Sequence, residues 1–165
     1  MPLRTLLAIV LCFASTTFVS ADEPFTRKED VIYGRKFGTA LTLDVFTPKE
    51  KPNRAAVIFT VSGGWFSSHD SINQAFVTPF INKGYTVFAV VHGSQPRFTI
   101  PEAIGDMHRS IRFIRSKADE FQINPNRIGI VGASAGGHLS LMMGTSGQPE
   151  NKEVKDPVDR QSSRV

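Results

Sequence analysis

The stretch RIGIVGASAGGHLSL, residues 127–141, decides the fold that we predict. Residues 127–131 form an apolar run of the length of a buried strand, and residues 135–144 read as a short helix that begins directly after a glycine-rich turn. Two earlier apolar runs, residues 55–61 and 85–91, show the same pattern of a strand that is covered on both faces. Three such runs predict a parallel sheet buried between helices.

Helical segments alternate with these strands. In residues 101–121 apolar side chains recur at steps of three and four residues, which is the periodicity of an amphipathic helix. Residues 72–83 indicate a weaker helix that Pro79 interrupts. Residues 31–37 and 40–46 are rich in β-branched and aromatic side chains and predict an antiparallel hairpin. The chain is therefore predicted to be α/β, with a mostly parallel sheet and an antiparallel N-terminal hairpin at its edge.

The N-terminus has the features of a secretory signal peptide. In residues 1–21 a short positive start at Arg4 precedes an apolar stretch and a small-residue site that ends at Ala21. The apolar stretch is shorter than the ~20 residues of a membrane-spanning helix, so we expect no stable membrane anchor. We expect cleavage near Ala21, one domain over residues 22–165, and a secreted or periplasmic protein.

Composition excludes several classes of function. The 165 residues carry a net charge of +4 without a basic stripe, which argues against a nucleic-acid partner. The single cysteine, Cys12, falls within the predicted signal peptide, so the remaining chain has no disulfide and no thiol nucleophile. No His, Asp or Glu group shows the spacing of metal ligands, and we expect neither a metal nor a cofactor.

The turn Gly-Ala-Ser-Ala-Gly, residues 132–136, carries the candidate nucleophile. A serine on a sharp strand-to-helix turn is forced into an unfavourable backbone region, and only small neighbours let strand and helix approach closely enough. In this turn every flanking residue is glycine or alanine. The helix N-terminus would also direct partial positive charge toward Ser134. These features favour a nucleophile elbow over a purely structural turn.

A second glycine-containing turn follows the strand at residues 55–61. Its sequence is Ser-Gly-Gly-Trp, residues 62–65. We expect the main-chain N–H of Gly64 or Trp65, together with that of Ala135, to form an oxyanion hole. A Gly-Gly turn is common at strand ends, so this prediction depends on its pairing with the serine turn.

Three side chains are candidates for binding substrate. Trp65 and Phe66 could form an aromatic wall for an acyl group or a sugar ring. Gln95 follows the strand at residues 85–91 at its carboxyl end, where open α/β sheets bind ligands. Plain loop structure is the alternative role for Gln95.

Both turns, together with residues 85–92 and 106–114, resemble the α/β-hydrolase superfamily, specifically its lipase/esterase branch, which includes acetyl xylan esterase and feruloyl esterase-like secreted enzymes. The resemblance covers residues 31–165. It implies a serine carboxylic ester hydrolase that acts on a small-molecule or polysaccharide ester through an acyl-enzyme on Ser134. The branch usually has a histidine at the position of Ser62. This difference affects the rigidity of the loop more than catalysis, because that histidine is not part of the catalytic triad.

The same resemblance implies an acid and then a histidine after the nucleophile. The only histidine after Ser134 is His138, one helical turn along, and we do not expect it to be the general base. Either the chain is the inactive amino-terminal part of a longer hydrolase, or it is a non-catalytic secreted binding or scaffold protein. The fragment is favoured because the strand at residues 127–131 would otherwise remain an unpaired apolar edge. A peptidase or acyltransferase using the same serine is a further alternative.

Overall fold

A computed structural model describes residues 23–165, so the predicted signal peptide lies outside the described residues. Five strands form one sheet: β1 (Phe25–Lys36), β2 (Thr39–Pro48), β3 (Ala56–Val61), β4 (Thr86–Val91) and β5 (Ile128–Gly132). Their order in the sheet is β1-β2-β4-β3-β5. The helical elements are η1 (His69–Ser71), α1 (Gln74–Ile81), α2 (Ile100–Ser116) and α3 (Ala135–Ser146). No helix of the described residues is long and apolar enough to cross a membrane.

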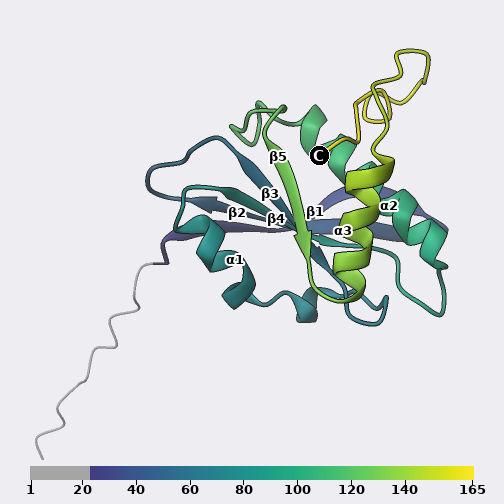
Figure 1. The fold of residues 1–165 in the computed structure, drawn as a ribbon, viewed down its shortest axis with the longest axis horizontal. Coiled ribbons are helices and arrows are strands. Elements are labelled where there is room, and N and C mark those ends of the chain that lie inside the picture. Colours follow the sequence, from purple (N-terminus) through teal and green to yellow (C-terminus); the bar gives the residue numbers. More distant parts are fainter. Residues whose placement is uncertain (1–22) are drawn as a thin grey trace, which may run out of the picture.

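Helices cover both faces of the sheet (Figure 1). On one face α2 and α3 contribute fully buried side chains such as Met107, Ile111 and Leu139, which pack against strand residues including Ile58. On the other face α1 packs Val77 and further residues against a separate apolar cluster. This three-layer arrangement confirms the predicted α/β architecture.

The strand pairing confirms the predicted sheet. β4, β3 and β5 are parallel neighbours, whereas β1 and β2 form an antiparallel hairpin that joins β4 through β2. The hairpin turn has positive φ at both Phe37 (45°) and Gly38 (73°), as a type I′ turn requires. Because Thr60 of β3 pairs with Gly132 of β5, the carboxyl ends of these two strands lie side by side.

Some predicted boundaries were wrong. β1 begins at Phe25 rather than at residue 31. Residues 27–30 are charged and exposed on an edge strand, so they lack the alternation of apolar and polar residues by which a half-buried strand is predicted. α2 ends at Ser116 rather than at residue 121, although Phe121 is still buried against the core. α3 continues to Ser146, two residues beyond the predicted end.

Candidate functional site

β5 delivers Ser134 to the surface through a sharp turn into α3. Ser134 has φ 52° and ψ −122°, a conformation that L residues rarely adopt, and it is exposed. A Cβ on Gly132 would lie 2.5 Å from the carbonyl group of Gly136, and a Cβ on Gly136 would lie 2.6 Å from the carbonyl oxygen of Thr60. Both glycines are therefore required by close backbone approach. A strained, exposed serine at a helix N-terminus is the geometry of a nucleophile elbow.

The turn after β3 presents unused backbone donors. Gly63 and Phe66 exchange two backbone hydrogen bonds of 2.9 Å, and Gly64 and Trp65 between them have φ of 56° and 60°. These angles are those of a type I′ turn. Within residues 23–165, the N–H groups of Gly64 and Trp65 donate to no other group, and neither does that of Ala135 at the start of α3. The predicted oxyanion donors are thus unpaired.

The elbow and this turn border one cavity of about 240 Å³. Ala133 lines it from the elbow, and Ser62, Gly63 and Phe66 line it from the turn. Phe76 of α1 supplies part of its apolar wall. The structure therefore brings together the two motifs that the sequence places 70 residues apart.

The predicted substrate-binding residues lie around the same turn. The Trp65 ring meets His138 of α3 edge-on, with ring centroids 6.0 Å apart, and its buried Nε1 has no hydrogen-bond partner among the described residues. Phe66 is 56% exposed. Gln95, also exposed, donates its backbone N–H to the carbonyl oxygen of Trp65 at 3.3 Å. The loop after β4 thus lies beside the turn after β3.

Each of the four histidines has contacts away from Ser134. His69 lies beside two carboxylates, His92 contacts Ser62, His108 contacts Ser163, and His138 contacts Trp65. His138 donates its backbone N–H to the Ser134 carbonyl oxygen at 3.0 Å, but no imidazole of the described residues is hydrogen-bonded to the Ser134 hydroxyl. The described part of the chain therefore holds the candidate nucleophile Ser134 without an imidazole beside its hydroxyl.

The charged residues of α2 have structural partners. Asp106 pairs with Lys36 at 2.6 Å, and Arg109 pairs with Asp156 at 2.7 Å and with Asp159 at 2.9 Å. Arg109 thus makes ion pairs with the segment that follows α3. They tie the segment after α3 back onto α2.

One group of potential metal ligands comes together that sequence spacing did not reveal. Oxygen or nitrogen atoms of Asp30, Asp44 and His69 lie within 4.8 Å of one another. The buried Asp44 carboxylate already receives the Arg27 guanidinium at 2.6 Å, and both imidazole nitrogens of His69 face carboxylate oxygens. The contacts are those of a polar network, with an Arg27–Asp44 ion pair, that joins η1 to the hairpin.

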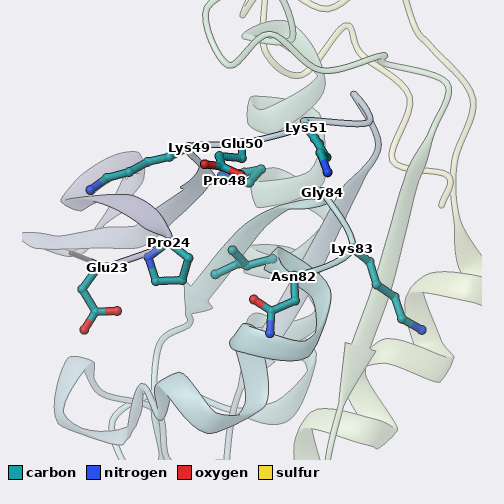
Figure 2. A pocket seen from close by; sticks show the side chains of 10 residues that line it. Glu23, Pro24, Pro48, Lys49, Glu50, Lys51, Asn82, Lys83 and Gly84 are labelled. Carbon is teal, nitrogen blue, oxygen red and sulfur yellow. The ribbon is translucent and has the colours of Figure 1, made fainter. Parts of the chain in front are cut away.

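A larger cavity, of about 600 Å³, lies at the opposite end of the sheet (Figure 2). It is bordered by the start of β1, the end of β2 and the segment between α1 and β4, with charged side chains that include Glu23, Lys51 and Lys83. The parallel strands begin at this end, whereas Ser134 follows the carboxyl end of β5. This cavity is remote from the elbow.

Two buried histidines predict acid sensitivity. Burial lowers the pKa of His92 and of His108, so each is harder to protonate in the folded than in the unfolded state. Below about pH 6.5 the unfolded state binds more protons, so the free energy of unfolding falls as the pH falls from 6.5. We expect a lower melting temperature at pH 5.5 than at pH 7.5, and a smaller difference in His108→Gln. A higher melting temperature at pH 5.5 would contradict this assignment.

The comparisons with known proteins agree with this geometry. The sequence matches the BD-FAE family over residues 43–164. The acetylxylan esterase of Xylanibacter ruminicola is 34% identical over 101 residues, which are 61% of this chain and 21% of that protein. The probable carboxylic ester hydrolase LipM of Mycobacterium tuberculosis is 30% identical over 140 residues, which are 82% of this chain and 32% of that protein. The chain thus spans about a fifth to a third of these curated relatives.

A solved structure shows the same fold. The acetyl ester-xyloside bifunctional hydrolase from Caldicellulosiruptor lactoaceticus superposes with a TM-score of 0.71 at 26% identity, over 82% of this chain and 53% of that one. An esterase from Thermogutta terrifontis, 23% identical, superposes with a TM-score of 0.69 and supports the fold alone. The predicted resemblance to α/β-hydrolase esterases is confirmed.

Proposed function

The chain belongs to the BD-FAE family, and from this premise we propose that it is the nucleophile-bearing part of a serine carboxylic ester hydrolase. The observation that carries the proposal is the conformation of Ser134, strained and exposed at the N-terminus of α3. A strained backbone conformation costs free energy and persists only where the surrounding structure holds it in place. Such conformations cluster at active sites, where the strain contributes to the mechanism.

The backbone around Ser134 suits acyl transfer. The Ser134 hydroxyl oxygen would attack the ester carbonyl carbon while its proton passes to a general base, and the carbonyl oxygen would become an oxyanion. The N–H of Ala135 and that of Gly64 or Trp65 would donate to this oxyanion, since none of them has another acceptor among the described residues. Collapse of the intermediate breaks the bond to the alcohol oxygen, which takes the proton back from the base and leaves as the alcohol. Water then hydrolyses the acyl-enzyme to the carboxylic acid and regenerates the Ser134 hydroxyl.

We further propose that the general base and its acid partner belong to a longer protein and lie beyond Val165. Within residues 23–165 the imidazole rings of the histidines contact groups other than the Ser134 hydroxyl. The curated relatives are three to five times longer than the matched region, which leaves ample chain for both groups. The 165 residues alone would then be inactive.

The proposed substrate is a small-molecule or polysaccharide ester. The names of the acetylxylan esterase and of the carboxylic ester hydrolase among the relatives support an ester substrate, and Trp65 and Phe66 offer an aromatic surface beside the elbow. A non-catalytic binding protein and a peptidase or acyltransferase remain the competing functions.

The test compares the full-length gene product with the 165-residue chain. We expect the full-length protein to hydrolyse nitrophenyl acetate and to release acetate from acetylated xylan, and a fluorophosphonate probe to modify the peptide that contains Ser134. Peptide cleavage without ester hydrolysis would favour a peptidase. A full-length protein with neither turnover nor labelling would favour a binding protein.

We also propose that residues 1–21 are removed as a signal peptide and that the protein acts outside the cytoplasm. The charged start at Arg4, the apolar stretch and the small residues before Asp22 support cleavage at this point. N-terminal sequencing of the exported protein is expected to begin at Asp22. An intact Met1 on protein recovered outside the cytoplasm would contradict the proposal.

A further inference from the structure

The loop that carries the proposed oxyanion donors is attached to a buried imidazole. His92 follows β4 and is only 3% exposed. Its Nε2 lies 2.9 Å from the hydroxyl oxygen of Ser62, and its Nδ1 lies 2.8 Å from the carbonyl oxygen of Gly93. Ser62 directly precedes the turn that contains Gly64 and Trp65.

The partners of His92 define which nitrogen carries the proton. The carbonyl oxygen of Gly93 can only accept a hydrogen bond, so Nδ1 is protonated and donates to it. In a neutral imidazole Nε2 is then an acceptor. The Ser62 hydroxyl therefore donates to Nε2. The Gly93 carbonyl oxygen thus determines the direction of both hydrogen bonds of the His92 ring.

The peptide that orients His92 is itself held. The N–H of Gly93 donates to the Asp106 carboxylate at 2.9 Å, and the same carboxylate oxygen accepts from the Lys36 ammonium group at 2.6 Å. A Cβ on Gly93 would lie 2.7 Å from the ring of Phe98. The support of His92 therefore comes from both α2 and β1.

His92 also holds the far end of the loop. Its backbone N–H donates to the Ser67 hydroxyl oxygen at 3.2 Å, and Ser67 in turn donates to the carbonyl oxygen of Val61. The ring of His92 thus binds residue 62 while its backbone binds residue 67. One residue bridges both ends of the segment whose middle carries Gly64 and Trp65.

We propose that His92 and Ser62 are positioning residues that fix the oxyanion donors of the 63–66 turn. The inference rests on the proposed function, because it gives the turn a role in ester hydrolysis. Donors stabilise a developing oxyanion only if they are held in place before the reaction. The chain has serine where the esterase branch usually has histidine, and in this protein the imidazole comes from the neighbouring loop.

Matched substitutions separate the hydrogen bond from the shape of the side chains. Ser62→Thr retains the hydroxyl, whereas the similarly shaped Ser62→Val removes it. His92→Gln keeps an acceptor near the position of Nε2, whereas His92→Met removes it. We expect Ser62→Val and His92→Met in the full-length protein to lower kcat about tenfold with KM changed less than about twofold. Ser62→Thr and His92→Gln should stay within about threefold of wild type.

The control is Thr145→Val, at an exposed position near the end of α3, which should leave kcat and KM unchanged. Equal kcat values for folded Ser62→Thr and Ser62→Val would overturn the positioning role, as would fluorophosphonate labelling of Ser62 itself. If Ser134→Ala retains activity, the proposed function fails instead.

A spectroscopic measurement does not depend on the variants folding. Nitrogen NMR of the His92 imidazole in the wild-type protein at pH 7.5 should show Nδ1 protonated and Nε2 unprotonated. The opposite tautomer would contradict the proposal directly, because Ser62 could then not donate to Nε2.

Discussion

Replacing Ser134 by alanine is expected to lower kcat for nitrophenyl acetate about 10⁴-fold in the full-length protein. The substitution removes the only proposed nucleophile and leaves the oxyanion donors in place, so weak residual catalysis by the backbone is still expected. The fold should persist, because alanine introduces no new atoms into the turn. Steady-state kinetics measure the loss, and thermal denaturation shows that the variant is folded.

Ser116→Ala is the matched control for this prediction. Its hydroxyl donates to the carbonyl oxygen of Phe113 at the end of α2, away from the elbow. We expect its kinetics to equal those of wild type. A Ser134→Ala protein with wild-type turnover would exclude an acyl-enzyme on this residue. The proposed serine ester hydrolase would then be wrong.

Local sequence patterns were sufficient to predict the part of the fold that surrounds Ser134. The strand at residues 128–132, the tight turn and the following helix are all encoded within one short stretch, so sequence periodicity and small residues reveal them. The Gly-Gly turn after β3 could also be recognised, because it follows a continuous apolar run. Strands, turns and helices that depend on adjacent residues can thus be predicted from the sequence alone.

Features that join distant parts of the chain could not be predicted in the same way. His92 reads as an ordinary loop histidine, and nothing in the sequence indicates that it meets Ser62, 30 residues earlier. The charged residues at the start of β1 do not read as a strand in the sequence. In the structure Arg27 of this segment pairs with the buried Asp44 across the hairpin. Such contacts depend on sheet order and register, which periodicity does not reveal.

Gly136→Ala is expected to destabilise the protein by about 3 kcal/mol. Its Cβ would lie 2.6 Å from the Thr60 carbonyl oxygen, which belongs to the backbone of β3, a strand paired on both sides, and cannot rotate away. The start of α3 would therefore have to move off the sheet. Because Ser134 and the N–H of Ala135 move with it, kcat should also fall about 100-fold, as small misplacements of reacting groups do.

Gly144→Ala tests whether this effect arises from the contact or from changing a glycine in α3. Gly144 lies in the same helix, but a Cβ there would meet no atom within 4 Å beyond the neighbouring backbone of α3 itself. Alanine is also the better helix former, so this variant should gain about 0.5–1 kcal/mol and keep its activity. Urea denaturation and steady-state kinetics of both variants provide the comparison. Equal stability of Gly136→Ala and wild type would show that α3 is not packed against β3 as closely as the elbow geometry requires.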